Sequence, residues 1–359
     1  MLLKTFKWPL AVTVVALVGA FILGGPTAFG LVAILAVLEI SLSFDNAVVN
    51  ATVLERMNPF WQKIFLSIGI IIAVFGMRLI FPLIIVGITA HLNPIEVVQK
   101  ALDGGSVDTP GTYAHLLHDA HPAIAAFGGM FLLMLFLDFV FEDREIAWLA
   151  WIERPLAKVG KLDQLSVVVA LAALVVVAQT IAEHPDTVMV SGVLGLLVYL
   201  LVGGLGDLFE EAGEHEEVED GGPGSAVQAA GKAAFFLFLY LEVLDASFSF
   251  DGVIGAFAIT QDIFIIAVGL GVGAMYIRSL TVFLVRRGTL SEYVYLEHGA
   301  MWAIGALAVI LLITIKYEVP EIVTGLIGVG FIALAFISSL IRRRNEPAEE
   351  RENETLTVG

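Results

Sequence analysis

The chain has 359 residues, of which 58% are apolar and 15% are charged, and its formal net charge is −17 at pH 7. Soluble domains carry roughly 25% charged residues, so this composition excludes a chain folded entirely as water-soluble domains. The absence of cysteine excludes disulfides, thiolate metal sites and thiol nucleophiles. The negative charge argues against a nucleic-acid partner.

The apolar residues fall into blocks of about 20, which is the length that crosses a hydrocarbon core about 30 Å thick. Because a bilayer offers no water to the backbone, segments that span it are helices. We therefore predict an all-α polytopic membrane protein with about ten transmembrane helices. In chain order the predicted spans are 9–24, 30–54, 63–90, 122–141, 165–182, 187–205, 232–257, 262–285, 298–315 and 320–341.

The first 29 residues form an extra helix ahead of the rest. Lys4 and Lys7 precede its apolar block, as in a secretory signal peptide. The Gly-Gly-Pro at 24–26 is a turn signal, and no small-x-small cleavage pattern lies near it. We favour a first helix that stays uncleaved, with cleavage as the alternative.

Lysine and arginine accumulate in every second connector, as they do in cytoplasmic loops. The connectors predicted outside contain only Lys100 and Lys316. This bias places both termini in the cytoplasm, and we expect the inner membrane of a prokaryote. The basic residues predicted inside are Arg56, Lys63, Arg144, Arg154, Lys158, Lys161, Lys232, Arg286, Arg287, Arg342, Arg343 and Arg344.

Two connectors are long. The outer one, 91–121, holds His91, His115, His118 and His121 at irregular spacing, and a transition-metal site is the alternative to a plain loop. The inner one, 206–231, holds eight acidic residues. We interpret it as a solvated linker between a first half (30–205) and a second half (232–341), with a cytoplasmic protein partner as the alternative. The polar tail 342–359 is predicted to be disordered.

The chain also matches itself. In both halves an acid stands six residues before an aspartate, with Ser-Phe directly ahead of that aspartate. The matches, in the same order, are 39–45 with 245–251, Gly69 and Arg78 with Gly269 and Arg278, and 121–128 with 298–305. Matching spans are five apart, an odd number, so a duplication predicts two inverted-topology repeats, a plan of secondary transporters.

The acidic motifs at 39–46 and 245–251 are the predicted binding site. A charge near the bilayer centre costs about 2.5–3.5 kcal/mol, so matched acids inside two spans call for a function or a partner. Carboxylate and amide oxygens suit manganese, magnesium or calcium. We predict Asp45 and Asp251 as metal ligands, with co-ligands or proton acceptors Glu39, Asn46 and Asp245.

The helical period puts Glu39, Ser43, Asn46 and Asn50 on one stripe and leaves Asp45 off it. Asp245 and Ser249 repeat the stripe, and Asp251 again lies off it. Either each aspartate faces a separate partner, or the helix loosens around Ser-Phe-Asp, which is tolerated at membrane depth only inside protein or beside a wet cavity.

Arg78 and Arg278 are expected to pair with the acids, either as packing devices or as charge-pairing and gating groups together with Ser43 and Ser249. Four further residues carry weaker expectations. Asp138 ends its span at the inner face as a snorkelling helix end or a proton relay. His121 and His298 are expected to begin their helices as interfacial residues or metal ligands, and Asn50 is a further possible oxygen ligand.

These motifs resemble the TerC family of integral membrane proteins, within the LysE-like transporter group. The signature Glu-x-x-Leu-Ser-x-Asp-Asn reads Glu39 to Asn46, and Asp-x-x-Phe-Ser-x-Asp reads Asp245 to Asp251. Gly252 stands where that family has a small polar residue, and Arg78 and Arg278 follow the motifs as its arginines do. The chain is longer than simple members. The resemblance implies export of divalent metal, chiefly manganese.

The leading hypothesis is therefore a divalent-cation exporter with its site at the repeat interface and no tightly bound cofactor, the metal being the substrate. The alternative is a membrane assembly protein that holds a partner through 206–231, with its buried acids as structural ion pairs. An enzyme is not expected, because we find no phosphate-binding loop, no His-Glu-x-x-His motif and no serine nucleophile with a histidine partner.

Overall fold

A computed structural model describes residues 2–162, 164–217, 231–260, 262–287 and 293–345. Within these ranges every regular element is a helix. The helices are α1 (Leu2–Leu42), α2 (Phe44–Glu55), α3 (Pro59–Ile71), the π-helix η1 (Ile72–Ile80), α4 (Phe81–Thr89), α5 (Pro94–Asp103), α6 (Tyr113–Phe141), α7 (Ala150–Val159), α8 (Leu165–Thr180), α9 (Pro185–Glu217), α10 (Gly231–Ile259), α11 (Ile263–Arg287), α13 (Leu296–Thr314) and α14 (Glu321–Asn345).

The described part of the chain has seven helices long and apolar enough to cross a membrane, which confirms a membrane protein. They are Thr5–Ile40, Pro59–Thr89, Tyr113–Phe141, Pro185–Gly204, Ile263–Val285, Leu296–Thr314 and Val323–Arg344. The count of about ten and the inverted repeats stay predictions. The predicted span 9–24 lies in α1 before a kink at Gly25, and the span 30–54 is divided between the rest of α1 and α2. The helix for 165–182 has 16 residues, and the helix for 232–257 carries the buried acids Glu242 and Asp245.

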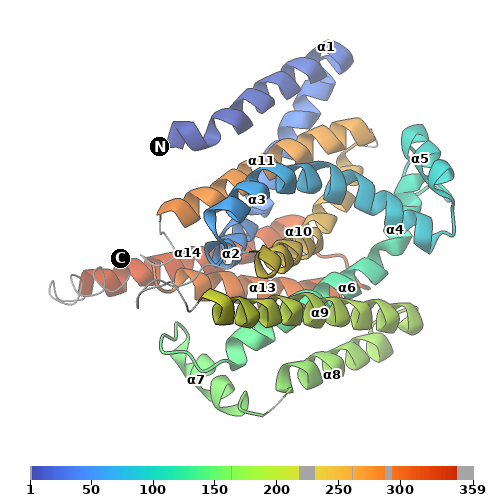
Figure 1. Cartoon of the computed structure of the whole chain (residues 1–359). Helices are drawn as coiled ribbons and strands as arrows, with labels where there is room; N and C mark the ends of the chain where they lie inside the picture. The colour runs from blue at the N-terminus through green and yellow to red at the C-terminus, as the bar shows by residue number, and fades with distance from the viewer. Residues whose placement is uncertain (1, 163, 218–230, 261, 288–292, 346–359) are drawn as a thin grey trace.

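The turn signal at 24–26 produces a sharp kink within α1. Gly25 has φ 69° and ψ −163°, a backbone conformation that L side chains rarely adopt. Pro26 follows it and has no backbone N–H to donate to the preceding turn. The chain therefore changes direction between the blocks that the sequence divides at this point (Figure 1).

The helices extend further into the connectors than the hydropathy pattern predicts. The outer connector contains α5, whose N-terminus is closed by a capping box between Asn93 and Glu96. Helix α6 begins at Tyr113 with Thr112 as its N-cap, so the prediction that His121 begins a helix is wrong. Helix α9 continues to Glu217 and α14 to Asn345. Polar residues with good helix propensity prolong helices once packing has started them.

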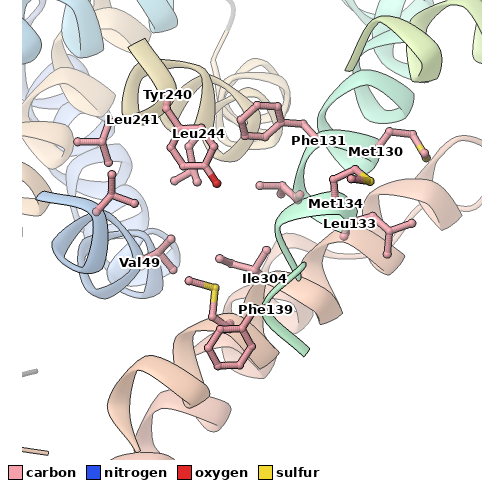
Figure 2. Close-up of a cluster of buried hydrophobic side chains, with 14 of the residues drawn as sticks. Val49, Met130, Phe131, Leu133, Met134, Phe139, Tyr240, Leu241, Leu244 and Ile304 are labelled. Carbon is pink, nitrogen blue, oxygen red and sulfur yellow. The ribbon is translucent and has the colours of Figure 1, made fainter. Parts of the chain in front are cut away.

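The main hydrophobic core lies where α2, α6, α10 and α13 meet (Figure 2). Val49, Phe131, Leu244 and Ile304 each expose 1% or less of their surface there. A second core joins α4, α5 and α6 to α10 and α11 around Leu117, a fully buried side chain. The motif helices α2 and α10 are thus central elements of the bundle, which fixes their positions firmly.

Helix α1 packs against α11, and α6 packs against both α9 and α13. Figure 1 shows the helices running broadly side by side, with α1 at one edge and α8 at the other. The start of α1, the end of α14 and the short helix α7 lie at the same end of this bundle. We call it the basic end, because the connectors with most lysine and arginine lie there.

Candidate functional site

The first acidic motif contains a break in its helix. Helix α1 ends at Leu42 and α2 begins at Phe44, and Ser43 between them has φ −97° and ψ 16°. The backbone is therefore loosened at this motif, as one of the two alternatives predicts. The second motif differs, because α10 runs without interruption from Gly231 to Ile259.

Arg78 and Glu39 form a buried ion pair between η1 and α1, with side-chain exposures of 2% and 3%. The guanidinium also donates from Nη1 to the backbone oxygen of Ala73 at 2.7 Å. Ser43 donates from its hydroxyl to Oε1 of Glu39 at 3.1 Å. We call this group the Arg78 cluster. It brings together three of the predicted site residues and holds one carboxylate against one guanidinium.

Arg278 forms a second buried cluster between α11 and α10. Its Nη1 and Nη2 donate to the two carboxylate oxygens of Glu242 at 2.9 and 3.1 Å, and Nη2 also donates to Oδ2 of Asp245 at 3.3 Å. The guanidinium carbon lies 4.1 Å from the ring centre of Phe65, a cation–π contact. This Arg278 cluster therefore sets two carboxylates against one guanidinium.

Glycines also lie where the helices of one half contact the arginine cluster of the other half. A methyl group at Gly69 would lie 2.5 Å from Nη1 of Arg278. A methyl group at Gly273 would lie 2.4 Å from Cγ of Glu39, and one at Gly252 would lie 3.2 Å from Oε2 of Glu39. Because Gly252 follows Asp251 directly, the first motif's glutamate lies against the backbone of the second motif.

The two motif aspartates belong to helices that the structure describes, but their side chains, and that of Ser249, lie outside the described part. Asn46 is buried, with an exposure of 4%. Asn50 is fully buried, and neither of its amide atoms has a hydrogen-bond partner among the described residues. Among the described side chains, no group of three or more His, Asp or Glu residues is arranged to hold a metal ion.

Asp138 and His121 lie apart from these clusters on α6. Asp138 is exposed on the protein surface, and its Oδ2 accepts a hydrogen bond of 2.6 Å from the hydroxyl of Tyr199 on α9. His121 is half-buried within α6. His115, another histidine of the connector 91–121, lies with its Nδ1 2.8 Å from the backbone oxygen of Val107.

His298 begins α13 as predicted and lies against a buried glutamate at the basic end. Its Nδ1 is 3.1 Å from Oε2 of Glu153, which belongs to α7. Glu153 also accepts hydrogen bonds from Trp302 Nε1 and from the backbone N–H groups of Trp148 and Leu149, at 2.9, 2.9 and 3.3 Å. This Glu153 anchor fastens the connector between α6 and α8 to the bundle.

The surroundings of Glu153 change its acidity. Burial acts to raise the pKa of the carboxyl, but the polar contacts of His298 and Trp302 and the backbone bond from Leu149 act the other way. Their sum holds the pKa of Glu153 below its ordinary value of 4.5. The carboxyl is therefore ionised at neutral pH.

Glu242 and Glu153 are site residues that the sequence patterns did not single out. Glu242 stands three residues before Asp245 and so lies on the same face of α10. Its matching position in the first half is Ala36, so a search for matched acids passes over it. Glu153 lies in a short connector helix, and only the fold shows that it is buried.

Residues 44–346 match the family described as Protein of unknown function (DUF475). The match covers most of the chain. The chain belongs to this family. The match begins at Phe44, so it includes the second motif and both arginines but leaves out α1 and Glu39. No curated protein and no solved structure matches the chain.

Proposed function

We propose that this membrane protein exports a divalent metal cation, manganese first among the candidates, through a site between its two acidic motifs. What supports the proposal most is the contact between the motifs inside an apolar helix bundle. Glu39 of the first motif lies against Gly252, the residue directly after the second motif, and each motif contributes an acid to a buried arginine cluster. Sites of inverted-repeat transporters lie at such interfaces.

The contacts divide the predicted ligands into two groups. Glu39 and Asp245 are engaged by arginines, so in the proposal they hold the motif helices in place. Asp45 and Asp251 supply the carboxylate oxygens for the metal. Asn50 is fully buried, its amide atoms have no hydrogen-bond partner among the described residues, and in the proposal it is a further oxygen ligand. A mixed carboxylate and amide set suits a hard divalent cation.

The break at Ser43 supports a binding role for the first motif. A helix interrupted at membrane depth frees backbone carbonyl groups, which coordinate cations in transporters. Asp45 follows Ser43 by two residues and so stands in the first turn of α2. In this arrangement the cation meets side-chain and backbone oxygens at the same level of the bundle.

The test is metal flux into liposomes that contain the purified full-length protein and an internal manganese-sensitive dye. We expect Asp45→Asn and Asp251→Asn each to lower the flux at least tenfold. The matched control is Asp186→Asn, which changes an exposed acid in the first turn of α9. Flux retained in both motif variants, or no flux of manganese, magnesium or calcium in the unmodified protein, would overturn the proposal.

A second candidate function is a membrane assembly protein, and the ion pairs favour it. Both motif acids with described side chains already have arginine partners, as expected for residues that only fix helix packing. The acidic connector would then recruit the partner. Deleting residues 210–220 separates the two proposals, because it would abolish partner binding but leave the metal flux of an exporter largely intact.

A further inference from the structure

Helix α7 has two opposite faces. Glu153 and Ala157 are buried against the bundle, and they lie on one side of the helix at a spacing of four residues. Trp151, Arg154 and Lys158 are exposed and lie on the other side. The connector between α6 and α8 is therefore an amphipathic helix with a defined outward face.

The Glu153 anchor fixes which face points outward. Its carboxylate binds Trp302 of α13 and two backbone N–H groups just ahead of α7. A carboxylate at a helix N-terminus is also favoured by the helix dipole. With these contacts on one side, α7 has little freedom to roll about its axis.

The outward face combines positive charge with exposed apolar surface. Trp151 is 77% exposed, and Leu162, in the turn that follows α7, is 62% exposed. Arg154 and Lys158 have no hydrogen bond or ion pair with any residue that the structure describes, and Lys161 lies 3.7 Å from the exposed carboxylate of Asp143. Cations beside an exposed tryptophan in a chain of net charge −17 are a local exception to its overall charge.

Helix α7 lies at the end of the bundle where a membrane surface is expected. It connects α6, a membrane-length helix, to the apolar α8, and it lies at the basic end of the bundle, near one edge (Figure 1). The positive-inside rule places that end at the cytoplasmic leaflet. A helix there with tryptophan, lysine and arginine on its outward face has the composition of an interfacial helix.

We propose that the outward face of α7 binds the headgroups of anionic phospholipids in the cytoplasmic leaflet. Arg154 and Lys158 of α7 contact the phosphates together with Lys161 in the turn that follows the helix. Trp151 of α7 and Leu162 in the same turn enter the region between headgroups and acyl chains. An acidic protein would match the cations but would leave this apolar surface uncovered. The lipid surface satisfies both features together, since interfaces attract basic residues and tryptophan alike. The proposal does not depend on metal transport.

The first test measures lipid affinity. The detergent-purified full-length protein is titrated with phosphatidylglycerol or phosphatidylcholine, and bound lipids are counted by native mass spectrometry. Each basic residue near an anionic leaflet contributes about fivefold to binding. We expect the double variant Arg154→Gln/Lys158→Gln to bind phosphatidylglycerol at least about tenfold more weakly, with binding of phosphatidylcholine unchanged.

The matched control is Lys100→Gln/Lys316→Gln, which removes two positive charges from the connectors predicted outside. It should change the affinity less than about twofold. An equal loss in both double variants, or an unmodified protein without preference for phosphatidylglycerol, would show that the binding is not a property of α7.

The second test locates the helix in the membrane. Because the chain has no cysteine, Trp151→Cys introduces a single site for a nitroxide label. In vesicles containing phosphatidylglycerol, we expect oxygen to relax this label more strongly than a water-soluble nickel complex does. A label at Glu145→Cys, an exposed connector position, should show the reverse. A label at 151 that is open to water, or shielded from both reagents by a protein, would contradict the proposal.

Discussion

Arg78 and Arg278 stand at matching positions in the two halves of the chain, and their buried surroundings differ in charge. In the Arg78 cluster one carboxylate, that of Glu39, faces the guanidinium. In the Arg278 cluster Glu242 and Asp245 face it together. The first group is formally neutral when ionised, and the second carries one surplus negative charge.

The backbone of the two motifs also differs, and here the first motif is the more irregular one. The first motif has a broken helix at Ser43 beside its balanced ion pair, whereas the second motif lies in a continuous α10 beside its surplus carboxylate. Two arginines at matching sequence positions are thus both buried, while their partners differ. The two motifs therefore differ in kind: the first has an interrupted helix at Ser43, and the second has one more carboxylate than its arginine can neutralise.

The largest expected effect comes from removing the arginines. Arg278→Met leaves two carboxylates buried without their cation, and Arg78→Met leaves one. Breaking a buried pair costs about 3–5 kcal/mol, so both variants lose stability and Arg278→Met loses more. The measurement is the thermal unfolding midpoint of each variant in detergent. Equal midpoints for the two variants would mean that the surplus carboxylate of the Arg278 cluster does not add to the loss of stability.

A smaller and opposite difference is expected when one acid is neutralised in each cluster. Glu242→Gln keeps a polar acceptor and leaves Arg278 paired with Asp245, so we expect a change of no more than about 1 kcal/mol. Glu39→Gln removes the one carboxylate that the described residues offer to Arg78, and should cost about 3 kcal/mol. Chemical unfolding of both variants in the same detergent checks the order, and a larger loss in Glu242→Gln would reverse the comparison.

The smallest effect concerns Glu153, a fourth buried carboxylate, which lies outside the membrane-spanning helices. Its pKa in the folded protein is below its ordinary value, so its contribution to stability is present above that value and is lost as the pH falls through the folded pKa. We expect Glu153→Gln to be less stable than the unmodified protein at pH 7. The difference should shrink as the pH falls from the ordinary value through the lowered pKa of the folded protein, because the carboxyl of Glu153 is then protonated and uncharged like the glutamine side chain.

Unfolding midpoints measured from pH 7 to pH 3 test this expectation. Glu145→Gln, at an exposed position of the same connector, serves as the control and should show no pH-dependent difference. A gap between Glu153→Gln and the unmodified protein that widens in acid would mean that the carboxyl is not stabilised in its ionised form.

Several features follow from the sequence because they depend on local chemistry. Apolar blocks of membrane length predict spanning helices, and the Gly-Gly-Pro at 24–26 predicts the change of direction at Gly25. The helical period also put Glu39 and Ser43 on one stripe, and the two side chains are hydrogen-bonded. Each of these predictions needs only neighbours in the chain.

Other features were decided by packing between helices that are distant in the chain. Periodicity shows which residues share a face but not which side chain comes to lie opposite. The pairing of Arg278 with Glu242, the contact of Glu39 with Gly252 and the burial of Glu153 beneath Trp302 are of this kind. The sequence by itself determined a membrane protein with acids and arginines inside its helices. Only the tertiary structure decided which charges meet, because a buried charge is satisfied by whatever partner the packing brings within hydrogen-bond distance.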